Sequence, residues 1–179
     1  DLRKIRREYQ LTESETADFL FDTLSRFDLS ADQVKRIIGE DREKVSITAS
    51  IKKMSENPYI IFEQYVGFDS DDAIPFYKID NGVIPSPEYG IEEILDNGST
   101  ERLRAYCVDE LNRIPAHSFG KADTILQRIN ARIDRLPEWK RHVYKLQNFD
   151  VETKILDGAL ERKKDDKDDL YLYLRDVYE

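Results

Sequence analysis

Residues 56–68 have the sequence ENPYIIFEQYVGF, and this stretch decides the fold of the first half of the chain. Asn57-Pro58 predicts a turn, because the residue before a proline avoids helical backbone angles. The apolar residues 59–65 predict a short helix, and Gly67 predicts a tight turn. Residues 70–79 then predict a second helix. The stretch therefore predicts a helical hairpin at about residues 57–80.

Other segments show the helical spacing of apolar residues. They are residues 12–27, 31–38, 42–54, 99–114, 121–136, 138–147 and 151–163. Thr12 with Glu15 and Ser30 with Gln33 predict capping boxes, in which side chain and backbone cap each other at a helix start. A left-handed C-cap is expected at Gly39, and Asp80-Asn81-Gly82 is expected to end the second hairpin helix. Cys107 falls on the apolar face of its predicted helix, so we expect a core thiol and not a nucleophile.

The C-terminal residues differ from the rest. RKKDDKDD (162–169) predicts a polar turn, and LYLYLRDVYE (170–179) alternates as a strand does. We therefore predict a mainly α fold with two domains. The first, residues 1–96, is a helical bundle of helix-hairpin-helix type. The second, residues 97–179, is a small helical or winged-helix-like module with a short C-terminal β element.

The formal net charge of −9 is unevenly distributed. Residues 1–55 sum to 0, residues 56–101 to −10, residues 102–145 to +5 and residues 146–179 to −4. Nucleic-acid binding depends on Lys and Arg, so the acidic block disfavours it and the basic block favours it. The 56–101 surface is instead a candidate for a basic protein partner.

A search for catalytic and cofactor motifs gives none. Gly120-Lys121 lacks the first glycine and the hydroxyl residue of a phosphate-binding loop, so ATP binding by that route is excluded. Asp69, Asp71 and Asp72 do not continue into a calcium loop, because Ala73 and Ile74 follow. His117 and His142 lie far apart, which disfavours zinc. We expect no enzyme, no metal and no cofactor in this chain.

A membrane location is not expected either. No apolar run approaches the roughly 20 residues that cross a bilayer, and the N-terminal residues DLRKIRREYQ lack the apolar part of a signal peptide. We expect a soluble, cytoplasmic protein.

A helical hairpin with a glycine turn is one way to bind a DNA phosphate, because backbone N–H groups at the turn can approach it closely. The hairpin candidates are Val66, Gly67, Phe68 and Ser70. The alternative is an ordinary helical hairpin, which is common in proteins.

Five stretches in order carry a resemblance to a known family. They are LSADQVKRIIGED, ENPYIIFEQYVGFDSDDAI, ERLRAYCVDEL, AHSF and LYLYLRDVYE. This order resembles the N-terminal region of the RecD-like DNA helicases, which include the exonuclease V alpha subunit. The resemblance runs from about residue 17 to the C-terminus.

The resemblance implies a non-catalytic accessory region that binds or positions DNA ahead of a motor domain. ATP and Mg²⁺ are implied only for a motor domain downstream. The chain departs from the family pattern at Tyr65, where the family has glycine, at Asp69, where a basic residue is common, and at Ala116, where the family has glycine. Asp69 would repel a phosphate, so we expect the hairpin to keep its fold and lose its affinity for DNA.

The basic block offers a second place for DNA, single-stranded or at a junction. Lys121, Arg128, Arg132 and Arg135 fall on one face of the predicted helix from Lys121, and Arg102, Arg104, Lys140 and Arg141 would extend the patch. The alternative is a solvated helix surface. Tyr59, Tyr65 and Phe68 are candidates for base stacking, with burial in the core as the alternative.

Two functions from different classes follow from these patterns. One is the DNA-binding accessory region of a helicase. The other is a protein-interaction domain on a degenerate helix-hairpin-helix scaffold, which docks a partner or its own motor domain.

Overall fold

The computed structural model describes residues 14–114, 119–150 and 153–175. The chain divides into two compact units, residues 1–85 and 86–179. The sequence placed the division after residue 96, which lies in the same irregular connection. Thr12 of the first predicted capping box lies outside the described residues.

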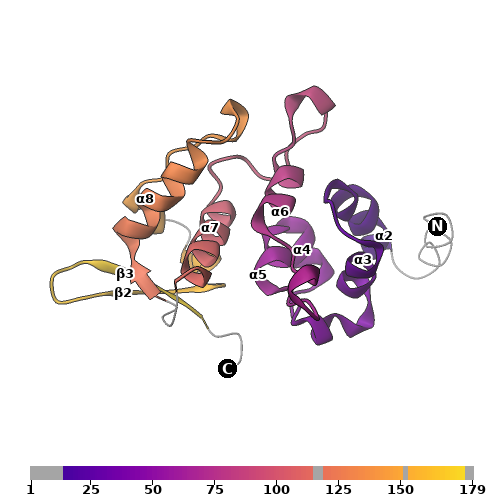
Figure 1. Ribbon diagram of the computed structural model, residues 1–179, viewed down its shortest axis with the longest axis horizontal. Helices are drawn as coiled ribbons and strands as arrows, with labels where there is room; N and C mark the ends of the chain where they lie inside the picture. Colours follow the sequence, from indigo (N-terminus) through magenta and orange to yellow (C-terminus); the bar gives the residue numbers. More distant parts are fainter. Residues whose placement is uncertain (1–13, 115–118, 151–152, 176–179) are drawn as a thin grey trace. The chain divides into compact units, whose positions relative to one another are not determined.

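Unit 1 is helical wherever it forms regular structure in its described part (Figure 1). Its α-helices are α2 (Ser14–Asp18), α3 (Ala31–Ile38), α4 (Ile51–Glu56), α5 (Tyr59–Gln64) and α6 (Phe76–Val83). Its other helical turns are a π-helix (Phe19–Thr23) and 3-10 helices at Leu24–Arg26, Glu40–Val45 and Ser70–Asp72.

The capping box of α3 is confirmed. The Gln33 backbone N–H donates to Ser30 Oγ over 3.1 Å, and the Ser30 N–H donates to Gln33 Oε1 over 3.0 Å. The predicted left-handed C-cap at Gly39 is wrong, because Gly39 is extended, with φ −75° and ψ 167°.

The continuous helix predicted at 42–54 is also wrong. Ser46 adopts a left-handed conformation, with φ 64°, and ends a 3-10 helix. Gln64 Oε1 then accepts hydrogen bonds from the N–H groups of Thr48 and Ala49, which satisfies those donors outside a helix. Ser50 caps α4 by accepting from the Lys53 N–H.

Two helices, α5 and α6, occupy the stretch predicted as a helical hairpin, but the second helix starts later than predicted. Residues 73–75 are extended before α6, as expected for residues leading into a proline. Asp80-Asn81-Gly82 does not end α6, which continues to Val83. The Gly82 backbone lies against Phe27, and a Cβ there would be 2.4 Å from Phe27 Cδ1. Gly82 thus permits a close packing contact and is not a helix stop.

The core of unit 1 forms where the apolar faces of these helices meet. Its fully buried members include Phe19, Leu24, Ile37, Val45, Ile47, Met54, Tyr59, Ile61, Ile79 and Val83. The aromatic pair Tyr59 and Phe76 is stacked, with ring centroids 5.8 Å apart, and joins the two hairpin helices.

Unit 2 combines helices with a small sheet. Its helices are α7 (Thr100–Asn112), α8 (Ala122–Ile133), α9 (Thr153–Leu156) and 3-10 helices at Pro87–Tyr89, Glu138–Lys140 and Leu146–Phe149. Its strands are β1 (Phe119–Lys121), β2 (Leu160–Lys164) and β3 (Leu170–Leu174). The sheet is antiparallel in the order β1-β3-β2.

The predicted C-terminal strand is confirmed as β3, the central strand of the sheet. Leu172 pairs with Gly120 on one side and Arg162 on the other, and its side chain is fully buried. The chain reverses between β2 and β3 through the predicted polar turn, where Asp168 has φ 64°. Cys107 is buried in α7, as predicted.

Two helices predicted in unit 2 do not form over their predicted lengths. Residues 141–145 are extended, because the Asn130 side chain exchanges two hydrogen bonds with the Tyr144 backbone, at 2.9 and 3.0 Å. In the described part of the stretch predicted as a helix at 151–163, only α9 is helical; residues 157–159 form a turn and residues 160–163 pair with β3 as part of β2. In both segments a contact with a distant residue overrides the local helical pattern.

The described residues contain no helix with the length and apolar character that crossing a membrane requires.

Candidate functional site

The tip of the hairpin in unit 1 is exposed, while its base is packed. Val66 and Phe68 are 60% and 67% exposed, whereas Tyr59 and Tyr65 are buried. The Val66 N–H donates to the Val45 carbonyl over 2.9 Å, which fixes the start of the tip. Phe68 is therefore the member of the predicted stacking set that remains accessible.

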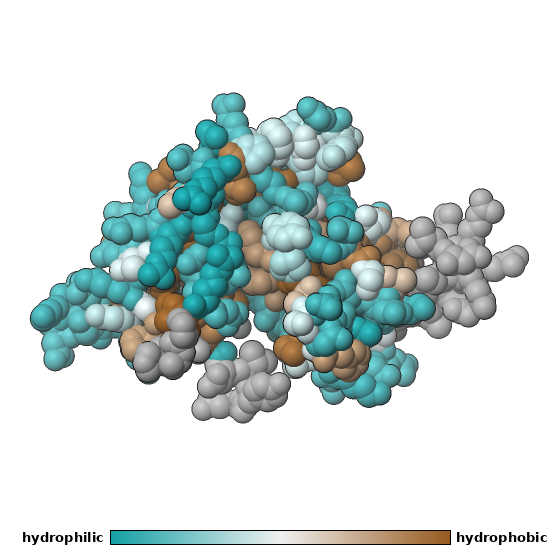
Figure 2. All heavy atoms as spheres, viewed as in Figure 1, coloured by the Kyte–Doolittle hydropathy of each residue, from teal (hydrophilic) through white to brown (hydrophobic). Residues whose placement is uncertain are grey.

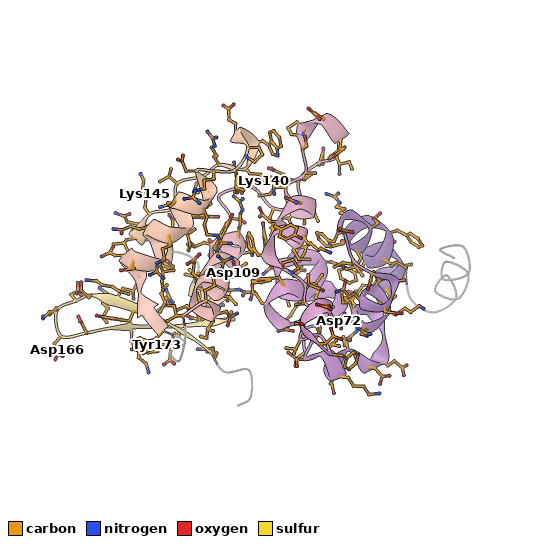
Figure 3. All side chains as sticks on the ribbon, viewed as in Figure 1. Asp72, Asp109, Lys140, Lys145, Asp166 and Tyr173 are labelled. Atoms are coloured by element: carbon orange, nitrogen blue, oxygen red, sulfur yellow. The ribbon has the colours of Figure 1, made fainter. Side chains whose placement is uncertain are left out.

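The residue at the centre of the tip is Asp72, labelled in Figure 3. Its Oδ2 accepts from Arg36 Nη1 at 2.5 Å and from the Phe68 backbone N–H at 3.1 Å. The Tyr65 hydroxyl lies 3.1 Å from both carboxylate oxygens. Three donors from separate parts of unit 1 thus converge on one carboxylate.

The charges at this cluster are mutually stabilising. Burial alone would raise the pKa of the Asp72 carboxyl, but the hydrogen bonds from Phe68 and Tyr65 and the charge of Arg36 outweigh it and lower that pKa. Burial, the largest influence on Tyr65, raises the pKa of its hydroxyl. The cluster is accordingly a carboxylate held ionised beside a neutral phenol and a guanidinium.

The surrounding turn is shaped to bring Asp72 close. A Cβ at Gly67 would lie 2.6 Å from the Asp72 carbonyl oxygen, so only glycine fits there without a shift. The Asp69 side chain accepts from the N–H groups of Asp71 and Asp72 at 3.0 Å, and Ser70 is exposed. The predicted hairpin residues Val66, Gly67, Phe68 and Ser70 therefore lie together. The Phe68 N–H already has a carboxylate acceptor.

The predicted basic stripe on α8 separates into paired and unpaired residues. Lys121 forms an ion pair with Asp169 at 2.8 Å, and this hydrogen bond raises the pKa of Lys121. Arg132 contacts Asp109 and Glu110 at 2.7 Å each and lies over the Tyr106 ring. Neither cation is free to neutralise a phosphate without losing a carboxylate partner.

Arg128 and Arg135 are the members of the stripe that remain available. Both side chains are exposed, and neither forms an ion pair with the described residues. The opposite face of α8 is buried through Ile125, Ile129 and Ile133, as predicted.

The proposed extension of the patch lies largely in the interior. Arg102 is fully buried, and its Nη1 donates to the carbonyls of Asn97 at 2.8 Å and Lys140 at 2.7 Å. Arg104 is buried and donates to the Ile155 carbonyl at 2.6 Å. Lys140 is buried as well, while Arg141 is exposed and donates to the Leu136 carbonyl.

The hydrogen bonds of Arg102 belong to a network that holds residues 97–99 against residues 139–145. The Tyr144 hydroxyl donates to the carbonyls of Asn97 and Ser99, and the Asn97 amide donates to the carbonyls of Trp139 and Arg141. Gly98 lies against the His142 ring, where a Cβ would be 2.6 Å from Cε1.

His142 is expected to titrate below the ordinary range for histidine. Burial is the main cause that lowers its pKa, and Arg102 lowers it further against an opposing effect of Asp96. A lowered pKa in the folded state means that the contribution of His142 to stability is complete above the pKa of the unfolded chain and is lost as the pH falls through the folded value.

An NMR titration of the imidazole resonances should place the His142 pKa in the folded chain below the His142 pKa in urea. The resonance is assigned with a His142→Gln variant. A folded-state pKa at or above the urea value would contradict this expectation.

A cavity of about 230 Å³ opens beside the first turn of α8, with Asp123, Asp150, Asp169 and Lys164 in its wall. Lys164 is paired with Asp168 at 2.9 Å, so the wall is predominantly acidic. This lining disfavours a phosphate. No group of three or more metal-ligating side chains comes together among the residues with described positions.

Sequence reasoning missed the Arg36–Asp72 pair. The two residues are 36 positions apart, and nothing in the local pattern of either segment connects them. His117 and Ala116 lie outside the described residues.

Comparison of the chain with models of protein families, with curated protein sequences and with solved structures gave no match.

Proposed function

We propose that this chain is a non-catalytic accessory region of a RecD-like ATP-dependent DNA helicase, and that its contact with DNA lies on α8 of unit 2. The observation that carries this proposal is the pair Arg128 and Arg135. Both are exposed and without ion-pair partners in the described part of the chain. Arg128 lies on α8, whose other face is packed in the core, and Arg135 lies in the turn that directly follows this helix. Such a helix can present its cations to a phosphate backbone.

The connectivity of unit 2 supports a winged-helix-like module. A helix, a strand and a second helix (α7, β1, α8) precede two strands that form a hairpin, and the sheet order is β1-β3-β2. Modules of this topology commonly use helices and the β-hairpin against DNA. Here the turn of the hairpin, residues 165–169, carries four Asp and one Lys, so α8 is the more favourable surface.

In this proposal, unit 1 helps to position the DNA and does not itself bind its phosphates. Its hairpin has the helix–glycine turn–helix order that the resemblance implies, but the Phe68 N–H donates to Asp72. Residues 56–85 of this unit carry six acidic side chains against one basic side chain, Lys78, and this excess of negative charge repels DNA.

The test is fluorescence anisotropy of a labelled single-stranded oligonucleotide at low and moderate salt. Arg128→Glu with Arg135→Glu should weaken binding by about tenfold or more at low salt, because two phosphate contacts become repulsive. The slope of log affinity against log salt should become shallower by about 1.4, since each lost single-strand phosphate contact contributes about 0.7.

The matched control is Lys52→Glu with Lys53→Glu, which makes the same charge change at exposed residues of α4 in unit 1. This variant should keep most of the affinity. An equal loss in both variants would show that net charge, and not the α8 surface, governs binding. Failure of the unmodified chain to bind at low salt would overturn the proposal of DNA contact.

A second candidate function is docking of a protein partner on the acidic surface of residues 56–101. The observation in its favour is the exposed apolar pair Val66 and Phe68 beside exposed Asp69 and Asp71. Apolar side chains rimmed by one sign of charge are typical of docking sites for oppositely charged proteins. Charge reversal at Asp69 and Asp71 should weaken such docking and leave DNA binding by α8 intact or stronger.

A further inference from the structure

The donors around Asp72 form a site of the kind that binds anions. A guanidinium from α3, a phenolic hydroxyl from the end of α5 and a backbone N–H from the tip all donate to one carboxylate. Two of these donors also contact each other, because Arg36 Nη1 donates to the Tyr65 hydroxyl over 3.1 Å. Arg36 lies in α3, which has its own capping box, and Tyr65 is buried at its ring.

The chemistry of these donors suits a phosphate as well as a carboxylate. Both groups present anionic oxygens that accept charge-assisted hydrogen bonds, and a guanidinium can hold two oxygens of either. A neutral hydroxyl and a backbone N–H add directional bonds without adding charge. Arg36 also lies 4.5 Å from the Phe68 ring centroid, and this cation–π contact helps to hold the guanidinium at the tip.

We propose that Asp72 is an internal anion that closes a phosphate site at the tip of the unit 1 hairpin. The carboxylate takes the place that a phosphate group would occupy against Arg36, Tyr65 and the Phe68 N–H. Removal of the carboxylate opens the site to a phosphate, either as the free ion or as part of a nucleic-acid backbone. This proposal is independent of DNA binding by α8, because the residues involved lie in different units.

The closure is effective because Asp72 is held in position by its backbone. Its carbonyl accepts from Gln33 Nε2 at 3.1 Å, and its N–H donates to Asp69 Oδ1 at 3.0 Å. A group fixed within the same molecule has a high effective concentration, so a weakly bound external anion cannot displace it.

The neighbouring charges limit how tightly an opened site can bind. Asp32 faces Arg36, and Asp69 and Asp71 lie in the same turn as Asp72. We therefore expect an opened site with a dissociation constant for inorganic phosphate of about millimolar.

The experiment is a titration of ¹⁵N-labelled chain with inorganic phosphate at constant ionic strength, followed at the Phe68 backbone amide. The unmodified chain should show no saturable shift. Asp72→Ala should show a saturable shift of the Phe68 amide, and addition of Arg36→Gln to that variant should abolish it. The matched control, Asp71→Ala, removes the same charge one residue away and should behave as the unmodified chain does.

A second arm replaces inorganic phosphate by a short single-stranded oligonucleotide lacking a terminal phosphate. A shift at Phe68 with both ligands assigns the opened site to phosphate groups in general, and a shift with inorganic phosphate alone restricts it to the free ion and excludes the phosphodiester backbone.

A folded Asp72→Ala chain that gives no shift at Phe68 would overturn the proposal, and so would an equal shift in Asp71→Ala. If Asp72→Ala loses the dispersion of a folded spectrum, Asp72→Asn takes its place. This variant removes the charge but keeps the size and one acceptor oxygen, and it should give a weaker saturable shift. A folded Asp72→Asn chain without any shift would equally reject the proposal.

Discussion

Replacement of Arg102 by Met is expected to lower the free energy of unfolding of unit 2 by about 2 to 6 kcal/mol, because two buried carbonyls lose their hydrogen-bond donor. The Arg102 side chain is fully buried and donates to the carbonyls of Asn97 and Lys140. Methionine is unbranched and apolar and has no donor, so both carbonyls lose a partner in a region shielded from water. Each buried group left unsatisfied costs about 1 to 3 kcal/mol.

Trp139 provides a local readout for this prediction. It is the single tryptophan of the chain, and its backbone carbonyl belongs to the network that includes Asn97. Urea unfolding followed by tryptophan fluorescence therefore reports on unit 2. The matched control is Arg128→Met, an exposed arginine of the same unit, which should change stability by no more than about 0.5 kcal/mol. Equal midpoints for the two variants would show that the Arg102 network is not what holds this part of unit 2 together.

The contrast between Arg102 and Arg128 shows where sequence reasoning stops. Both arginines were assigned to one basic patch, because both lie in a block of ten basic and five acidic residues. Charge counts and helical spacing place a residue on a face of its own helix, but they do not say what covers that face. Arg102 is covered by a segment about 40 residues later in the chain, which contributes the Lys140 carbonyl. That segment was itself predicted as a helix.

Local signals were sufficient where the stabilising contacts are local. Ser30 and Ser99 cap the helices that they were predicted to begin, because an N-cap hydrogen bond joins residues three apart. The apolar spacing in residues 121–136 identified the buried face of α8, and alternation identified β3. These features depend on neighbours in sequence, so the pattern contains the information.

The wrong helices share a different cause. Residues 42–54 and 138–147 have helical composition, but backbone N–H groups in each segment donate to the side-chain amide oxygen of a residue in another helix. This residue is Gln64 in unit 1 and Asn130 in unit 2. A pattern confined to one segment cannot reveal an amide 14 to 16 residues away that competes with the helix.

Only part of the candidate site could be predicted, because the rest of it depends on residues that are distant in the sequence. The glycine turn and its exposed Phe68 follow from residues 65–70 alone, and the acidic character of the turn suggested that the hairpin would not hold a phosphate. That expectation stays a prediction; in the structure the Phe68 N–H donates to Asp72. The participation of Arg36 depends on the packing of α3 against the hairpin, which the local sequence does not contain.

Gly82→Ala is expected to destabilise unit 1 by about 2 kcal/mol, although helix propensity alone predicts a gain. Alanine is favoured over glycine in a helix interior by about 1 kcal/mol, and Gly82 lies within α6. However, the added Cβ would be 2.4 Å from Phe27 Cδ1 and 2.7 Å from the Arg26 carbonyl oxygen. Phe27 can rotate only within a packed core, and the Arg26 carbonyl is backbone. Overpacking of this kind costs about 1 to 3 kcal/mol.

For a unit of this size, a loss of 2 kcal/mol lowers the melting temperature by about 8 to 16 °C. Thermal unfolding of unit 1 can be followed by hydrogen exchange of its peptides.

The cause of the loss can be separated from a general effect of substitution by combining Gly82→Ala with Phe27→Leu. Leucine lacks the Cε1 atom and the rigid ring, and its methyl groups can turn away from the new Cβ, so the cost of Gly82→Ala should be smaller in the Phe27→Leu chain than in the unmodified chain. Tyr77→Ala, at an exposed position of the same helix, serves as the control for changes in helix propensity and should leave unit 1 nearly unchanged. A stabilising effect of Gly82→Ala in the unmodified chain would show that Phe27 and the Arg26 carbonyl yield readily. The close contact of Gly82 with Phe27 and the Arg26 carbonyl would then not be the reason that this position requires glycine.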